Sequence, residues 1–145
     1  MPKVKDIVEI IESRAPLEYM LEFDCAGLNV GDMQSVVMGI LIAQNVTYST
    51  IEECAQAGAN LLITHHPCVF GEEPDEYMQS LVAKAKERGL ILYSCHTNLD
   101  CCKDGLNDFV ANKLGMTSVS VIDGCARCGD IKPARLSDLA EQVGK

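Results

Sequence analysis

Hydrophobic residues recur along the chain with a helical period in two clear segments. Residues 4–13 carry apolar side chains three or four positions apart, which predicts an amphipathic helix. Residues 76–88 repeat the pattern, and Gly89 follows where that helix should end. Further helices are expected over residues 47–57, 105–114 and 136–143. We therefore expect helices from one end of the chain to the other.

Three short apolar runs between these helices predict strands. They are residues 36–43, 60–64 and 90–94, and a fourth strand is expected over residues 119–122. The run 36–43 is apolar throughout, which is typical of a strand buried on both faces. Because strands alternate with helices, the pattern predicts an α/β fold, a layered domain with a mostly parallel or mixed sheet flanked by helices. No internal boundary stands out, so we expect a single α/β domain over residues 1–145.

Composition narrows the classes of function. With 48% hydrophobic and 23% charged residues, the chain is globular in type. Its net charge of -9 argues against binding nucleic acid, which needs clustered Lys and Arg. The longest apolar run is too short to cross a bilayer, and the N-terminal residues do not form a signal peptide. We therefore expect a soluble, cytoplasmic protein that is not bound to a membrane.

The chain has eight cysteines, for which we expect reduced thiols in a cytoplasmic protein. Cys125 and Cys128 form a lone CxxC motif, CARC. A zinc ribbon needs a second pair at suitable spacing, and the adjacent Cys101 and Cys102 do not supply one. Most of the cysteines are therefore interpreted as small apolar residues.

Two segments combine a short apolar strand with metal-ligand residue types. LLITHHPCVF (residues 61–70) places His65 and His66 directly after one strand, and LILYSCHTNLD (residues 90–100) places His96 and Asp100 after another. Ligands of α/β sheets bind beyond the carboxyl ends of the strands. Imidazole and carboxylate suit Zn, Fe or Mn. The sequence therefore predicts a metal site that contains His65, His66 and Asp100.

The spacing of the two adjacent histidines indicates two metal ions rather than one. Neighbouring residues of an extended segment point in opposite directions, and Pro67 favours an extended His66. Each histidine would then bind its own ion, with Asp100 as the bridge. His96 can ligate, orient Asp100 or carry a proton. The segment 24–31, DCAGLNVG, either lines this site or forms a structural turn. Thr97 and Asn98 either hydrogen-bond around the same site or make a turn, and the turn is the favoured interpretation.

Three motifs resemble one known family over essentially the whole chain. They are FDCAGLNVGD (residues 23–32), GANLLITHHPCVF (58–70) and YSCHTNLDCCKDGLNDFVANKLG (93–115). They are similar to the YbgI-type dinuclear metal-centre proteins, also called the Ngg-interacting-factor-three-like family, whose members carry the name type 2 GTP cyclohydrolase I. The resemblance implies an α/β fold, two divalent ions on His65, His66 and Asp100, and ring-like homo-oligomers, commonly hexamers.

Two departures from this family are visible in the sequence. The first strand of the family is often followed by an acidic residue, where this chain has Asn45. Family members also continue well past the length of this chain, and a later segment supplies a further His and a Glu to the metals. The chain therefore resembles the N-terminal part only, as a truncated product or a short form.

Two functional hypotheses follow. The first is a metal-dependent hydrolase of the GTP cyclohydrolase type, acting on a nucleotide or another small molecule. The alternative is a non-catalytic metal-binding or regulatory interaction protein, which the incomplete ligand set favours.

Overall fold

The computed structural model describes residues 1–71 and 73–144 of the chain. Contacts divide the chain into two compact units, Met1–Leu99 and Asp100–Lys145. The first unit has a four-stranded sheet and the second a two-stranded sheet. The single domain expected over residues 1–145 stays a prediction.

The sheet of the first unit is mixed. Its strands are β1 (Gly27–Val30), β2 (Ile40–Ala43), β3 (Leu61–Thr64) and β4 (Ile91–Ser94), and their order across the sheet is β1-β4-β3-β2. β2, β3 and β4 run parallel, whereas β1 pairs with β4 in the antiparallel sense. The predicted α/β fold with a mixed sheet flanked by helices is confirmed. The sequence pattern did not separate β1 from the loop before it.

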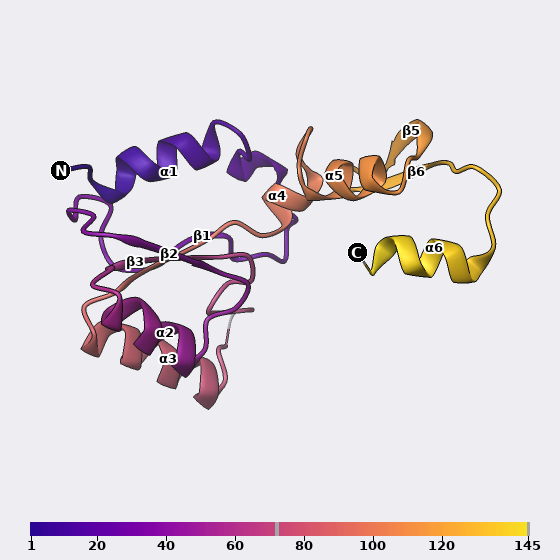
Figure 1. Cartoon of the computed structure of the whole chain (residues 1–145). Coiled ribbons are helices and arrows are strands. Elements are labelled where there is room, and N and C mark those ends of the chain that lie inside the picture. The colour runs from indigo at the N-terminus through magenta and orange to yellow at the C-terminus, as the bar shows by residue number, and fades with distance from the viewer. Residues whose placement is uncertain (72, 145) are drawn as a thin grey trace. The chain divides into compact units, whose positions relative to one another are not determined.

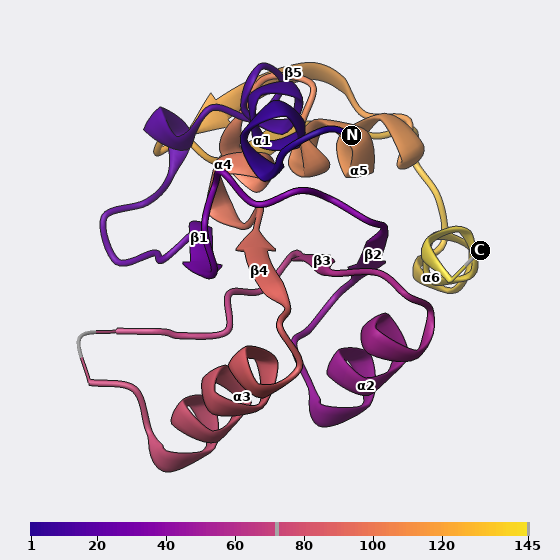
Figure 2. The same ribbon diagram turned by 90° about the vertical axis from the view of Figure 1, so that its left-hand side faces the viewer.

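Helices cover both faces of this sheet. α1 (Val4–Glu12) lies on one face, and α2 (Tyr48–Gln56) and α3 (Glu76–Glu87) lie side by side on the other (Figures 1 and 2). Thr47 starts α2 because its hydroxyl accepts a hydrogen bond from the backbone N–H of Thr50 at 3.1 Å. Among the residues described, no helix is both long enough and apolar enough to cross a membrane.

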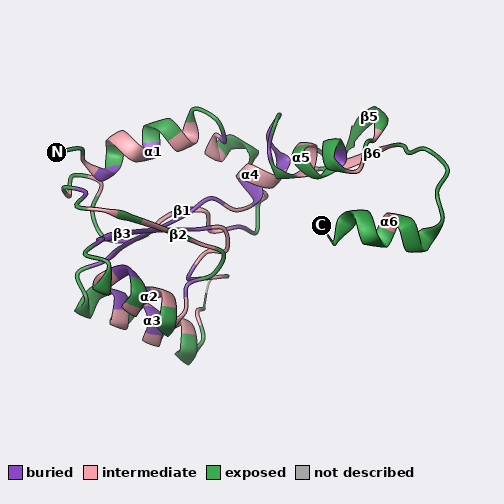
Figure 3. Ribbon diagram, in the orientation of Figure 1, coloured by how far each residue is buried: buried purple, intermediate pink, exposed green. Residues whose placement is uncertain are grey.

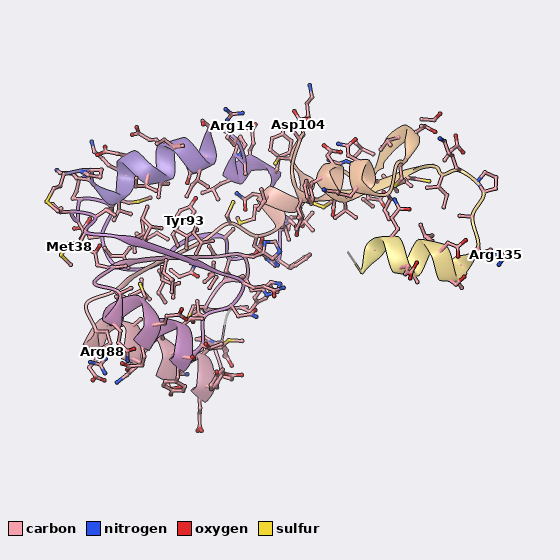
Figure 4. The ribbon with its side chains drawn as sticks, in the orientation of Figure 1. Arg14, Met38, Arg88, Tyr93, Asp104 and Arg135 are labelled. Carbon is pink, nitrogen blue, oxygen red and sulfur yellow. A yellow bond between two sulfur atoms is a disulfide. The ribbon has the colours of Figure 1, made fainter. Side chains whose placement is uncertain are left out.

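The main core lies between the sheet and the pair α2 and α3. The apolar side chains that form it come from β1, β3 and β4, from both helices and from the loops beside them. Its members are Val30, Val46, Ile51, Cys54, Ala59, Leu62, Cys68, Leu81, Ala85, Leu90 and Leu92. On the opposite face Tyr93 is fully buried beneath α1, and its hydroxyl donates to Glu12 at 2.9 Å (Figure 4).

β2 differs from its sequence prediction. The apolar run 36–43 indicated a strand buried on both faces, but Ile40 is 42% and Ile42 is 78% exposed. Figure 3 colours the ribbon by burial class, and exposed and intermediate residues alternate along β2. Leu41 and Ala43, which alternate with them, pack against the core. β2 is the last strand of the sheet, and its second face is open in this chain. The apolar run therefore predicted the strand correctly, but the prediction that both of its faces are buried was wrong.

The second unit contains a helical segment and a hairpin. α4 (Thr97–Cys101) leads into it and α5 (Leu106–Lys113) follows. β5 (Thr117–Ile122) and β6 (Ala126–Asp130) form an antiparallel hairpin, and α6 (Leu136–Val143) is the last helix. β5, α5 and α6 match predicted elements, whereas β6 and α4 were not predicted as regular structure.

The expectation of reduced thiols is wrong for Cys101 and Cys125, which form a disulfide. The turn between β5 and β6 returns the chain to the end of α4, so the two Cα atoms lie 4.1 Å apart. Cys125 of the CARC motif therefore pairs with Cys101 and not with Cys128. Cys54 and Cys68 are buried, as expected of small apolar residues.

Arg127 holds the same region together by hydrogen bonds. Its guanidinium pairs with the carboxylate of Asp108, and it also donates to the backbone carbonyls of Cys101, Cys102 and Cys125. The Arg127 side chain is nearly buried, which makes these bonds costly to lose. The hairpin, α5 and the end of α4 are thus joined by a polar network as well as by the disulfide.

Candidate metal centre

Two neighbouring parallel strands bring the histidines together. β3 ends at Thr64 and β4 at Ser94, and these two residues are partners in the sheet register. The backbone N–H of Cys95 continues the ladder by donating to the carbonyl of Thr64 at 2.9 Å. His65 and His96 therefore leave the same edge of the sheet, as expected for the carboxyl ends of parallel strands.

The three imidazoles form one cluster. The ring centroids of His65 and His66 are 4.8 Å apart, and the ring of His96 lies 5.1 Å from the first and 5.4 Å from the second. One ligand atom from each residue can be chosen so that all three lie within 4.8 Å of one another. All three residues are half-buried. Neutral imidazoles at such distances suit a divalent cation of the Zn or Fe type.

Hydrogen bonds set the orientation of each ring. Nδ1 of His65 lies 3.0 Å from the carbonyl oxygen of Cys95, and Nδ1 of His66 lies 2.5 Å from Oδ1 of Asn45. Nδ1 of His96 lies 2.8 Å from Oδ1 of Asp24. Carbonyl and carboxylate oxygens only accept, so each Nδ1 donates, and the lone pair of each neutral ring is at Nε2. Such outer partners are typical of metal-binding histidines.

Asp24 is a buried carboxylate at the back of the cluster. Its oxygens accept hydrogen bonds from the backbone N–H groups of Cys25 and Thr97, at 2.6 and 3.0 Å, from the Thr97 hydroxyl and from His96. Burial raises the pKa of the Asp24 carboxyl, but the hydrogen bonds from Thr97, His96 and Cys25 outweigh that effect and leave the pKa below its usual value. Asp24 is therefore ionised at neutral pH.

One expectation about the histidines is wrong. The strand ends at Thr64 and the chain bends at His65 and His66, so the extended geometry that would point them apart does not hold there. Their rings lie beside each other rather than on opposite sides of the chain. The inference that adjacent histidines cannot share one ion therefore loses its geometric basis.

Asp100 lies on α4, four residues after His96. The backbone N–H of Leu99 donates to the carbonyl of His96 at 2.9 Å, so the helical turn begins at that histidine. Asp100 is the first residue of the second unit, and its part in the metal site stays a prediction from the sequence.

Sequence reasoning missed two residues that contact the imidazoles. Asn45 was noted only as a departure from the family pattern, yet its amide oxygen contacts His66. Asp24 was left between a site role and a turn, and the structure gives it the contact with His96. The available signal was positional: Asn45 follows β2 at the same edge of the sheet where His65 follows β3.

Comparison with known proteins identifies the family of the chain. A family model described as Duf34/NIF3 (NGG1p interacting factor 3) matches residues 2–145. The chain is 40% identical over 124 residues to a "GTP cyclohydrolase 1 type 2 homolog" of Clostridium acetobutylicum, which covers 83% of this chain and 46% of the relative. A protein of the same name from Lactococcus lactis is 33% identical and covers 97% of this chain and 58% of the relative.

Solved structures give the same result. The structure titled "Reduced HcgD from Methanocaldococcus jannaschii" superposes with a TM-score of 0.87 at 32% identity, and covers 98% of this chain and 59% of that one. A Bacillus cereus protein "related to NIF3" gives a TM-score of 0.74 at 32% identity. The match covers 83% of this chain and 35% of that one. The chain spans about half the length of the curated relatives it matches. The predicted family resemblance is confirmed, and the chain belongs to the Duf34/NIF3 family.

Proposed function

We propose that this protein binds divalent metal through His65 and His66 and acts as a metal-dependent hydrolase of the GTP cyclohydrolase type. The observation that supports it is the cluster of three imidazoles whose ligand atoms lie within 4.8 Å of one another. His65, His66 and Asp100 would hold two divalent ions, which would be Zn, Fe or Mn. A bound divalent ion would lower the pKa of a coordinated water, so that a hydroxide nucleophile would be available at neutral pH.

The residues around the cluster contribute orientation and exclusion of water. Cys95, Asn45 and Asp24 hold the three rings in one tautomer, so the site is ordered before an ion binds. Phe70 lies edge-on to the His96 ring with centroids 5.5 Å apart, which limits access from that side. The proposed substrate is a nucleotide or another small molecule, because the relatives carry the name of a GTP cyclohydrolase homolog.

The test of this proposal is metal content and turnover measured on the same preparations. The purified chain should retain Zn, Fe or Mn, and the His65→Ala, His66→Ala double variant should lose it. Metal-dependent opening of the GTP imidazole ring would support hydrolysis. Normal metal content in the double variant would refute the site.

A second candidate is a non-catalytic metal-binding or regulatory interaction protein. The observation that favours it is the carboxylate of Asp24, which faces the cluster but has both oxygens occupied by hydrogen-bond donors. It is therefore unsuited to serve as a general base. Metal binding without turnover of any nucleotide would select this candidate, and rapid metal-dependent turnover would exclude it.

We also propose that the protein assembles as a cytoplasmic homo-oligomer, a hexamer by family resemblance. The open apolar face of β2, with Ile40 and Ile42 exposed, is consistent with burial in an assembly. Sedimentation equilibrium measures the mass directly. A monomer at all concentrations would refute the assembly.

A further inference from the structure

A disulfide within the second unit joins the end of α4 to the turn between β5 and β6. Cys101 is the last residue of α4 and Cys125 is the last residue of the turn, and their Cα atoms lie 4.1 Å apart. In the cytoplasm, which is the proposed location of this protein, permanent disulfides are rare, and those that form are usually transient, catalytic or redox-sensing. The pair therefore needs an account other than a permanent cross-link.

The turn that carries Cys125 is set by local backbone geometry. The backbone N–H of Cys125 donates to the carbonyl of Ile122 at 3.1 Å, and the two residues between them, Asp123 and Gly124, have φ values of 48° and 73°. Two consecutive positive φ values are typical of the type I′ turn, which Asp-Gly favours in two-residue hairpin loops. The hairpin therefore holds the backbone of Cys125 in place whether or not its sulfur is bonded.

Arg127 clamps the backbone on both sides of the disulfide. Its guanidinium donates to the carbonyl of Cys125 on one side. On the other side it donates to the carbonyls of Cys101 and Cys102, at 3.2 and 3.1 Å. The Asp108 carboxylate pairs with the same guanidinium by a charge-assisted contact, which is the strong kind of hydrogen bond. The two cysteines are thus held together by contacts that do not involve their sulfur atoms.

Cys101 and Cys125 differ in their access to solvent. Cys101 is buried, whereas Cys125 is partly exposed. The side-chain amide of Asn107 donates to the carbonyl of Cys125 at 3.1 Å and to its Sγ at 3.6 Å, which orients that sulfur. Thiol–disulfide exchange requires that an attacking thiolate reach one of the two sulfur atoms. A thiol from solution is therefore expected to attack Cys125, with Cys101 as the leaving group.

We propose that Cys101 and Cys125 form a reversible redox site, which thiols of low molecular weight open and which closes again to the same pair within a folded second unit. A thiolate attacks Sγ of Cys125, the S–S bond breaks, and Cys101 leaves as a thiolate that takes a proton from water. A second thiol attacks the mixed disulfide and releases Cys125, which is protonated in turn. Two thiols R–SH are thereby oxidised to one R–S–S–R, and the pair gains two electrons and two protons.

Equilibration of the full chain with reduced and oxidised glutathione tests the proposal. Samples at one pH and a series of glutathione ratios are quenched with acid and alkylated, and peptide mass spectrometry gives the reduced fraction of each cysteine. We expect Cys101 and Cys125 to become reduced together at ratios found in the cytoplasm, and to re-form the same pair when oxidised glutathione is restored. In ¹H–¹⁵N NMR spectra the signals of β5 and β6 should stay dispersed in the reduced form, because the turn and the Arg127 clamp remain.

Three other results would overturn the proposal. A pair that does not change its state over these ratios is not a reversible site. Reoxidation to pairs that contain Cys102 or Cys128 would show that the fold does not select the partner. Loss of the β5 and β6 signals on reduction would show that the disulfide is required for folding. Metal binding plays no part in these measurements, so the proposed metal function stands or fails separately.

Arg127→Lys tests the clamp, with Arg135→Lys as the matched control. Lysine keeps the positive charge but lacks the planar fork that reaches several acceptors at once. Arg135 is exposed at the start of α6, so the same chemical change is made away from the pair. Holding two thiols together raises their effective concentration, so we expect Arg127→Lys to lower the equilibrium constant for closing the disulfide against glutathione by about tenfold. The control should be unchanged, and an unchanged constant in a folded Arg127→Lys chain would overturn the clamp.

A second variant covers the case in which Arg127→Lys does not fold. Asp108→Asn removes the charge of the clamp's carboxylate, while Arg127 keeps its backbone acceptors. We expect the equilibrium constant for closing the disulfide to fall by about threefold. Cys128→Ser, at an exposed position of the same hairpin, should leave it at the wild-type value. A wild-type constant in Asp108→Asn, or an equal fall in Cys128→Ser, would overturn the role of the clamp.

Discussion

The contact between Asn45 and His66 allows the strongest quantitative prediction. Oδ1 of Asn45 lies 2.5 Å from Nδ1 of His66, at the position where the family resemblance leads us to expect an acidic residue. Removing the outer partner of a metal-binding histidine typically weakens metal affinity by about 10- to 100-fold. Because Asn45 is exposed, water can replace part of its contact, so we expect the lower end for Asn45→Ala, about tenfold or 1.4 kcal/mol.

Asn45→Asp should change affinity in the opposite direction. A carboxylate accepts a shorter and stronger hydrogen bond from Nδ1–H and makes the imidazole a better ligand. Zn²⁺ affinity is measured by competition with a chromophoric chelator. Gln44→Ala, at the exposed neighbouring position, is the matched control and should bind Zn²⁺ as the wild type does.

A double-variant cycle can refute this reasoning. If Asn45 acts through His66, Asn45→Ala should have no further effect on Zn²⁺ affinity in a His66→Ala chain. Equal weakening in both backgrounds would mean that Asn45 acts elsewhere. An unchanged affinity in the single variant Asn45→Ala would mean that the contact does not matter for the metal.

Three further predictions concern stability. Leu62→Ala, in the main core, should lower the free energy of unfolding by about 2–5 kcal/mol, while Ile42→Ala on the exposed face of β2 should change it by less than about 0.5 kcal/mol in the monomer, both from chemical denaturation. The Cys101–Cys125 disulfide spans 24 positions, so Cys101→Ser should destabilise the second unit by about 3 kcal/mol in thermal melts under oxidising conditions, and Cys128→Ser should not. The hydrogen bond from Arg127 holds the pKa of the Asp108 carboxyl below its ordinary value of 3.8, so its stabilising contribution is full above that pH and is lost as the pH falls through the lower folded value. Acid melts of Asp108→Asn should therefore show a smaller loss of stability in that range than the wild type, and an equal loss would contradict the assignment.

Local patterns predicted most elements of the fold because their information lies within a few residues. Apolar spacing identified α1 and α3. Thr47 and Ser49 could both cap the helix expected after them, and the structure has Thr47 as the N-cap of α2. Short apolar runs identified β3 and β4 for the same reason. The burial of β2 depends instead on its place in the sheet order, which is a property of the whole unit.

In the candidate site, too, some residues could be predicted from local sequence and others depend on the whole fold. His65, His66 and His96 were found because ligand residues after parallel strands meet at one edge of a sheet. The partners Asp24 and Asn45 come from loops 72 and 21 positions away from their histidines, and no spacing rule joins them. The disulfide was not predicted because a cytoplasmic location implied reduced thiols. Only the fold brings Cys101 and Cys125 close enough to pair.

Charge balance at the cluster leads to a last prediction, which concerns the number of ions. Three neutral imidazoles and one buried carboxylate suit a single divalent cation, but two such ions bring four positive charges. The Asp24 oxygens are occupied by four donors, so a second ion needs another carboxylate, and Asp100 is the residue proposed from the sequence. Asp100→Asn should therefore reduce Zn²⁺ stoichiometry from two ions per chain to one. Two ions retained in Asp100→Asn would remove Asp100 from the site, and one ion in the wild type would show that the dinuclear centre is incomplete in this chain.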